Sequence, residues 1–145
     1  MSVLLDTNVL TRSAQPSHPM HVDALNAVSG LRARGEELCI VPQNLIEFWA
    51  VATRPLNANG LEMTTVQSKF ELGRLKSFFR LLNDTAQIYD EWERLVVLHG
   101  VSGKNTHDAR LVAAMTTHGL DTLLTFNGSD FKRYPGITIV SPSDV

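Results

Sequence analysis

Short apolar runs alternate with longer segments of helical periodicity along this chain. Each run is a few residues long, is apolar or β-branched, and is bounded by polar or turn-forming residues, as in strands covered on both faces of a parallel sheet. The runs lie at residues 3–5, 38–41, 122–125 and 137–140, and a shorter one at 81–82 suits an edge strand. The pattern therefore predicts five strands.

Apolar residues at helical spacing fill the intervals between the predicted strands. The predicted helices run from Met20 to Arg34, from Pro42 to the residue before Pro55, from Thr65 to Phe79, from Thr85 to Gly100 and from Thr106 to Gly119. Thr64 and Gln67 have the spacing of a capping box, which marks a helix start. Strands that alternate with helices indicate an α/β fold with a mostly parallel central sheet.

The composition is that of an ordinary globular protein. Of the 145 residues, 43% are hydrophobic and 19% are charged, so we expect a single domain over residues 1–145. No apolar run approaches the roughly 20 residues of a membrane-spanning helix. The N-terminus also lacks the basic start and long apolar core of a signal peptide, so we expect a cytoplasmic protein without a membrane partner.

Charge and cysteine content narrow the possible chemistry. The formal net charge is −2, which gives no overall attraction to nucleic acid, so such a partner must be held locally or through metal ions. Cys39 is the only cysteine, which excludes an internal disulfide and a thiolate metal cluster. Its position within an apolar run indicates a buried, inert thiol.

Acidic residues recur where predicted strands end. Asp6 directly follows the first strand, and Glu47 lies in the first turns of the helix after the second strand. Asn127 and Asp130 follow the fourth strand. Because ligands bind at the carboxyl edge of an open α/β sheet, these side chains can meet there. Asp108 joins them only if the N-terminus of its helix points to the same edge. The alternative for Asp6 is a helix cap.

Carboxylates gathered at this edge repel one another, by about 4 kcal/mol per pair at roughly 4 Å and an effective dielectric constant near 20. Without a counter-ion one of them should keep a proton, because its neighbours raise its pKa. A divalent cation removes this conflict, and oxygen ligands without His or Cys favour Mg²⁺ or Mn²⁺ over zinc. Since such an ion lowers the pKa of a bound water and orients a phosphodiester, the pattern predicts hydrolysis of a phosphate ester.

Four segments, taken in order, resemble the signature blocks of PIN-domain ribonucleases. They are residues 5–9 (LDTNV), 44–49 (NLIEFW), 107–113 (HDARLVA) and 125–131 (TFNGSDF). One such block is weak evidence, whereas four blocks with matching intervals along almost the whole chain are specific. Within that family the chain is most similar to VapC-type toxins of bacterial toxin–antitoxin pairs.

The resemblance implies a PIN-like, Rossmann-like fold with three α/β/α layers and RNA cleavage that depends on Mg²⁺ or Mn²⁺. It implies metal ligands at Asp6, Glu47 and Asp108. The fourth acidic position is open, since many relatives carry Asp where this chain has Asn127. This amide either offers its oxygen or orients a metal-bound water, and Asp130 either acts as an outer ligand or caps the following turn.

Further candidate residues lie within or beside these blocks. Arg54 and Arg110 are candidates to bind RNA phosphates beyond the metal site. Thr7, Asn8 and Thr125 either support the acidic cluster and bind RNA or serve only as helix and turn caps.

The resemblance also implies partners. We expect an RNA substrate, a cognate antitoxin protein and a homodimer. Apolar residues of the helices near 45–52 and 70–82 indicate core packing first, and part of that surface is a candidate for binding the antitoxin or a second copy of the chain.

Three other functions fit parts of the pattern. A housekeeping RNA-processing nuclease would use the same site, and an inactive PIN-fold module that binds RNA or protein is suggested by Asn127. A phospho-receiver domain also gathers carboxylates at a sheet edge. However, it requires an acidic pair after the first strand, where Leu5 precedes Asp6, and a lysine where Phe126 follows Thr125.

Overall fold

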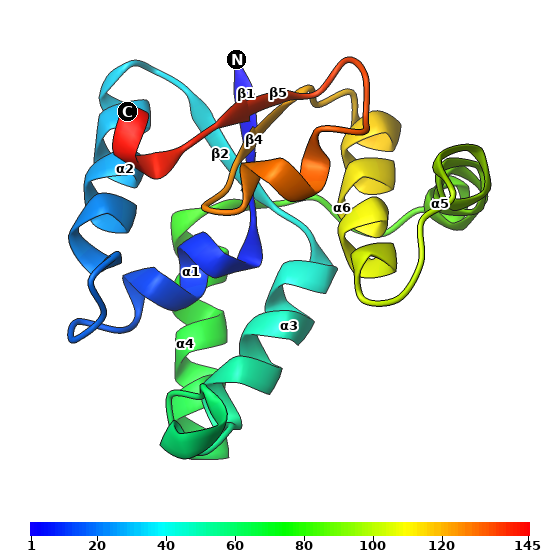
Figure 1. Cartoon of the computed structure of the whole chain (residues 1–145). Helices are drawn as coiled ribbons and strands as arrows, with labels where there is room; N and C mark the ends of the chain where they lie inside the picture. Colours follow the sequence, from blue (N-terminus) through cyan, green and yellow to red (C-terminus); the bar gives the residue numbers. More distant parts are fainter.

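One central sheet with helices on both faces forms the framework of the protein, as the computed structural model of residues 1–145 shows (Figure 1). Its strands are all parallel and lie in the order β3–β2–β1–β4–β5. They are β1 (Ser2–Leu5), β2 (Glu37–Ile40), β3 (Arg80–Leu81), β4 (Thr122–Leu124) and β5 (Thr138–Val140). The predicted three-layer α/β/α fold is confirmed, and the sheet is wholly rather than mostly parallel.

β1 lies at the centre of the sheet, and its side chains alternate between two hydrophobic cores. Leu4 belongs to one core together with Cys39 of β2 and Leu123 of β4. Val3 and Leu5 belong to the other core. Because both faces are covered, the strand is apolar at each of these positions, which is why the sequence pattern reveals it.

Six helices cover the two faces of the sheet. They are α1 (Thr7–Ser13), α2 (His21–Ala33), α3 (Pro42–Thr53), α4 (Thr65–Phe78), α5 (Ala86–His99) and α6 (Asn105–His118). Helices α1 to α4 pack on the core that contains Leu5, and α5 and α6 pack on the core that contains Leu4 (Figure 1). None of the helices has both the length and the apolar composition needed to cross a membrane.

The helix ends follow the predicted signals. At the start of α4 the Thr64 hydroxyl accepts a hydrogen bond from the Gln67 amide at 3.0 Å, and the Gln67 side chain accepts one from the Thr64 amide at 2.8 Å. α5 and α6 end at Gly100 and Gly119, whose φ angles of 59° and 73° lie in the left-handed region that suits glycine. Thr85 precedes α5, but its hydroxyl makes no capping bond.

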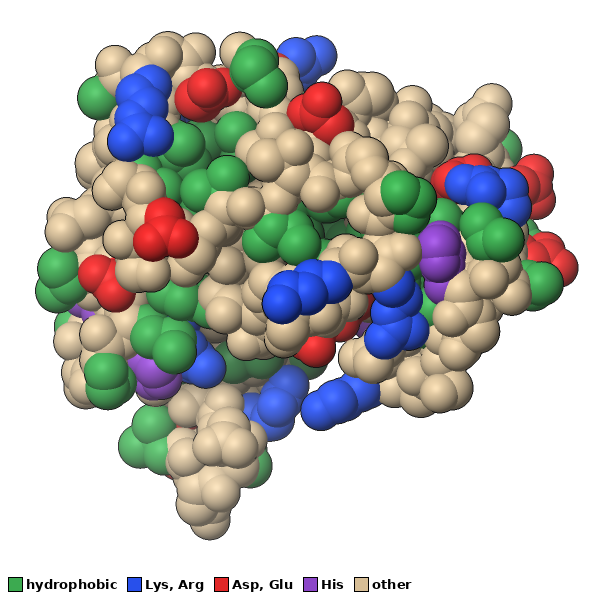
Figure 2. Space-filling view, turned by 45° about the horizontal axis from the view of Figure 1, so that its top comes forward, with side chains coloured by type: hydrophobic (Ala, Val, Ile, Leu, Met, Phe, Trp, Pro, Cys, Tyr) green, Lys and Arg blue, Asp and Glu red, His purple; other side chains and the backbone are tan.

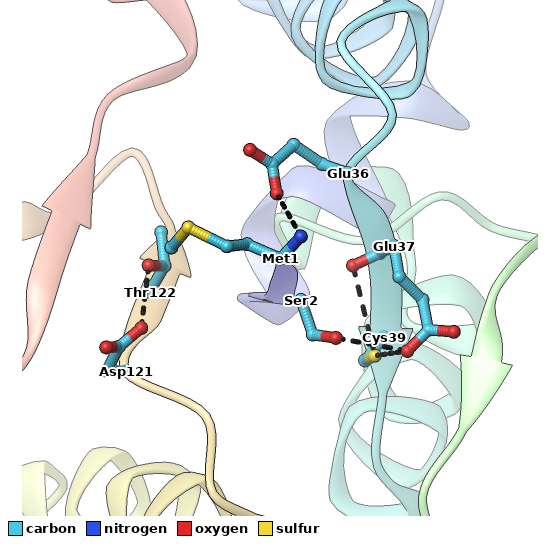
Figure 3. Close-up of polar contacts among 7 residues, drawn as sticks. All are labelled: Met1, Ser2, Glu36, Glu37, Cys39, Asp121 and Thr122. Atoms are coloured by element: carbon cyan, nitrogen blue, oxygen red, sulfur yellow. Dashed lines mark hydrogen bonds and ion pairs between the residues drawn. The ribbon is translucent and has the colours of Figure 1, made fainter.

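Polar contacts join the amino ends of the strands (Figure 3). Ser2 donates a hydrogen bond to Glu37 at 3.1 Å, and Glu37 pairs with Arg80 at 2.9 Å. Cys39 of β2 is fully buried, and burial raises the pKa of its thiol to about 11, so the thiol is inert at neutral pH, as predicted. These contacts fix the edge of the sheet opposite to the predicted acidic site.

Candidate active site

The carboxyl end of β1 is the point at which the strand order reverses. From β1 the sheet continues through β2 and β3 on one side and through β4 and β5 on the other. Open α/β sheets bind ligands at such a point. Asp6 is the first residue after β1, is only 7% exposed, and donates its backbone N–H to the carbonyl oxygen of Leu124 in β4 at 2.9 Å. Asp6 therefore lies between the ends of β1 and β4.

Both carboxylate oxygens of Asp6 accept hydrogen bonds. Oδ1 accepts from the Thr7 amide at 2.7 Å, and this contact caps α1. Oδ2 accepts from the Thr125 hydroxyl at 2.7 Å and from the Asn8 amide group at 3.3 Å. The helix-cap interpretation of Asp6 is therefore correct, but it accounts for only one of the two oxygens.

Thr125 connects the loop after β4 to this cluster. Its side chain is 1% exposed, and its hydroxyl accepts hydrogen bonds from the Asn127 backbone N–H at 3.0 Å and from Asn8 at 3.4 Å while donating to Asp6. Thr125 thus holds Asp6 and Asn8 in place through its buried hydroxyl. The exposed Asn127 joins the network through its backbone.

Glu47 reaches the same cluster from the second turn of α3. Its Oε1 accepts a hydrogen bond from the Thr7 hydroxyl at 2.7 Å, and its Oε2 accepts one from Gln43 at 3.2 Å. Asn44, which is fully buried, donates to the Leu5 carbonyl at 3.0 Å and to the Thr7 hydroxyl at 3.1 Å. The N-terminus of α3 is therefore attached directly to the end of β1.

Sequence reasoning does not single out Gln43 and Asn44, although both organise the site. The signal for Gln43 is its position one helical turn before Glu47, where side chains four residues apart lie side by side. The signal for Asn44 is its place at the third position of the helix. There its Oδ1 accepts a hydrogen bond from the Val41 amide at 2.8 Å. Their bonds to β1 and α6 arise only in the folded chain.

Asp108 lies in the first turn of α6 and is partly buried. Burial, together with the negative charges of Asp6, Asp130 and Glu47, raises the pKa of its carboxyl to about 7. The charge of Lys104 acts in the opposite direction. The N-terminus of α6 thus brings Asp108 within the electrostatic range of the other carboxylates.

The pKa of Asp6 is shifted for the same reasons. Burial, with a smaller contribution from the charges of Glu47 and Asp130, raises it to about 6, although the hydrogen bonds from Thr125 and Thr7 oppose the increase. A buried carboxyl group, that of Asp6, and a partly buried one, that of Asp108, therefore respond to the same negative charges of Glu47 and Asp130.

No basic side chain forms an ion pair with the acidic residues of the site. The five ion pairs of the structure do not include Asp6, Glu47, Asp108 or Asp130. Figure 2 shows acidic side chains within a recess of the surface, with Lys and Arg side chains around it. In this structure, no group of three His, Cys, Asp or Glu side chains is placed to hold a metal ion.

The two predicted RNA-binding arginines lie in different surroundings. Arg110 of α6 donates to Gln43 at 3.2 Å and pairs with Asp84 at 3.3 Å, so it is part of the site's polar network. Arg54 follows the last turn of α3 and is exposed, and its Nε donates to the Ala50 carbonyl. Arg54 lies seven positions after Glu47, which corresponds to about 10 Å along a helix axis.

A family model for the PIN domain matches residues 3–137 of the chain. The chain belongs to the PIN domain family. The family assignment made from the four sequence blocks is therefore confirmed. No curated protein matches the sequence.

Solved structures of VapBC proteins and of a VapC toxin share this PIN fold. A chain of VapBC2 from Rickettsia felis, bound to a promoter DNA fragment, is 18% identical with a TM-score of 0.70, and the match covers 97% of this chain and 98% of that one. For VapBC-1 from nontypeable Haemophilus influenzae the identity is 15%, the TM-score 0.72 and the coverage 99% of both chains. VapC20 from Mycobacterium tuberculosis, a sarcin–ricin loop cleaving toxin, is 18% identical with a TM-score of 0.67 over 89% of this chain and 92% of that one.

Proposed function

We propose that this PIN domain is an endoribonuclease that depends on Mg²⁺ or Mn²⁺, and that it is the toxin of a toxin–antitoxin pair. One observation carries the nuclease proposal: acidic side chains from four separate segments lie within electrostatic range of one another near the carboxyl ends of β1 and β4. They are Asp6, Glu47, Asp108 and Asp130. An RNA substrate in the cytoplasm is part of this proposal.

The donor chemistry of this group fits a hard divalent cation. Carboxylate oxygens are the preferred ligands of Mg²⁺ and Mn²⁺, and an oxygen that accepts one hydrogen bond keeps a second lone pair. We assign the ligands to Asp6, Glu47 and Asp108, with Asp130 or Asn127 at the fourth position. A bound ion would supply a water of lowered pKa and would polarise the phosphodiester.

The neighbouring residues hold these oxygens and bind the RNA. Thr7 orients Glu47, and Asn8 and Thr125 orient Asp6, through the hydrogen bonds described above. Arg54 is exposed and has no acidic partner, so its guanidinium is available for an RNA phosphate. We propose that Arg110 also binds the RNA.

The test is RNA cleavage by the purified protein with Mn²⁺ or Mg²⁺, and with a chelator. Asp6→Asn and Asp108→Asn should each lower cleavage by about 100-fold or more, since even residues that only orient metal ligands contribute 10–100-fold. Asp90→Asn is the control, because Asp90 is exposed on α5. Wild-type activity in both site variants would contradict the proposal.

The toxin assignment is supported by the VapBC likeness and by an apolar groove between α2 and α4. The groove has a volume of about 250 Å³ and includes Leu25, Val28, Leu75, Phe78 and Phe79. Phe78 is 52% exposed and Leu25 is 44% exposed. We propose that this groove binds a segment of the antitoxin.

The homodimer remains part of the proposal, supported by exposed apolar residues such as Ile46 on α3, which is 68% exposed. Light scattering of the purified chain tests it, and a monomer would contradict it. A co-purifying antitoxin encoded by a neighbouring gene would separate a toxin from a housekeeping RNA-processing nuclease.

One observation favours a different function, namely an inactive PIN-fold module that binds RNA or protein. No group of three His, Cys, Asp or Glu side chains is placed to hold a metal ion, and position 127 carries a neutral amide where the resemblance to PIN nucleases implies a carboxylate. Titration of Mn²⁺ in the presence of labelled RNA decides between the two. RNA binding without cleavage at any metal concentration would favour the inactive module.

A further inference from the structure

Gln43 makes three hydrogen bonds with parts of the candidate site. Its Nε2 donates to Glu47 Oε2 at 3.2 Å and to the His107 carbonyl in the first turn of α6 at 2.8 Å. Its Oε1 accepts from Arg110 Nη1 at 3.2 Å. The side chain is 7% exposed, so water does not replace these contacts easily. Gln43 therefore links α3, which carries Glu47, to α6.

The surroundings of Gln43 allow only one orientation of its amide group. Two acceptors, the Glu47 carboxylate and the His107 carbonyl, face its nitrogen, and a donor, the Arg110 guanidinium, faces its oxygen. A rotated amide would place donor against donor and acceptor against acceptor. A glutamate at this position would place a negative charge against Glu47.

Arg110 is itself held in place from the other side. Its Nη2 pairs with Asp84, which lies in the segment between β3 and α5, at 3.3 Å. The guanidinium is a rigid fork, so the ion pair on one nitrogen fixes the direction of the other toward Gln43. Contacts thus run from Asp84 through Arg110 and Gln43 to Glu47.

We propose that Gln43 is a positioning residue of the nuclease site. It fixes the Glu47 carboxylate relative to the first turn of α6, and hence relative to Asp108, the next residue after His107. The inference rests on the proposed function, because it assigns Gln43 a role in that same site.

Two substitutions of Gln43 separate positioning from charge. Gln43→Met has similar length and no charge but cannot donate, and Gln43→Glu has the same shape but adds a negative charge. We expect both to lower kcat on a short RNA, Gln43→Met by about 10- to 100-fold, with KM for RNA unchanged. The Mn²⁺ affinity of Gln43→Met, measured from the EPR signal of free Mn²⁺, should fall as well.

The control pair is Gln87→Met and Gln87→Glu, since Gln87 is exposed on α5. Wild-type kcat and Mn²⁺ affinity in Gln43→Met would overturn the inference. So would a Gln43→Glu variant that binds Mn²⁺ more tightly and cleaves at least as fast as the wild type, because charge alone would then explain the site.

Arg110→Met tests the same network at a side chain that is 35% exposed and is more tolerant of change. It leaves Gln43 with both of its donated bonds, so we expect a smaller loss of kcat, together with a rise in KM because Arg110 is also proposed to bind RNA. A rise in KM alone would mean that Arg110 binds RNA and does not position Gln43.

A wild-type protein that neither binds Mn²⁺ nor cleaves RNA would contradict the proposed function instead. The crystal structure of Gln43→Met then decides the inference independently of activity. A displaced Glu47 side chain or a shifted first turn of α6 supports it, and unchanged positions overturn it.

Discussion

Asp6 combines two roles that are often treated as alternatives. One of its oxygens caps α1, and the other is held by Thr125 and Asn8 within the acidic cluster. Since the cap fixes the side chain at the end of β1, it also fixes where the second oxygen lies. A short acidic residue at a strand end can therefore cap the following helix and also belong to an acidic cluster.

The raised pKa values of Asp6 and Asp108 predict how the stability of the metal-free protein changes with pH. With values of about 6 and about 7 in the folded protein, both groups bind protons more tightly than in the unfolded chain, where an aspartate has a pKa of about 3.9. The folded state is therefore favoured at low pH, and this contribution is lost as the pH rises from about 4 through about 7. Urea denaturation at pH 5 and pH 7.5 measures it.

We expect this difference to shrink in the Asp6→Asn and Asp108→Asn variants, because each removes one of the two groups. Mn²⁺ should increase stability at pH 7.5 more than at pH 5, because it compensates the ionised carboxylates. A wild-type protein whose stability rises between pH 5 and pH 7.5 more than that of both variants would contradict the interpretation.

The secondary structure was predictable because its signals are local. The strands beside β1 are buried on both faces and so consist of apolar runs, and α4, α5 and α6 begin or end at a capping box or at glycines with positive φ. The connections between elements were not predictable. The sequence relates Gln43 and Asn44 only to their neighbours within α3, whereas their bonds to α6 and β1 depend on tertiary packing.

Asn44 provides a test at this scale, because it anchors the start of α3 to the end of β1. Asn44→Leu would leave the buried Leu5 carbonyl and the Val41 amide without their partner, at a cost of about 1–3 kcal/mol for each buried polar group left unpaired. We expect a loss in the free energy of unfolding of at least about 1 kcal/mol, measured with urea. Asn26→Leu on the exposed face of α2 is the control, and equal stability of the two variants would show that the anchor has no effect.

At the scale of the whole molecule, the acidic site and the apolar groove are formed by different side chains. The groove residues come from α1 to α4, whereas the carboxylates gather at the ends of β1 and β4 and at the start of α6. Cleavage and partner binding should therefore be separable by mutation. The sequence indicated the apolar content of these helices, but which residues stay exposed depends on how α2 and α4 pack.

Phe78→Asp tests this separation. The substitution removes a large apolar side chain from the groove, so it should weaken binding of the antitoxin by tenfold or more and should leave RNA cleavage by the free protein unchanged. Affinity is measured by titration calorimetry with the co-purified partner. Val97→Asp, at an exposed site on α5, should bind normally, and normal binding by Phe78→Asp as well would place the partner elsewhere.

The central position of β1 also has a consequence for protein synthesis. β1 is translated before the other strands of the sheet, and β4, which pairs with it, is translated after β2 and β3. A nascent chain therefore carries Asp6 without Thr125 beside it until β4 has been made. Chains released before β4 is made lack two of the five strands, so only chains that include β4 and Thr125 can carry an assembled site.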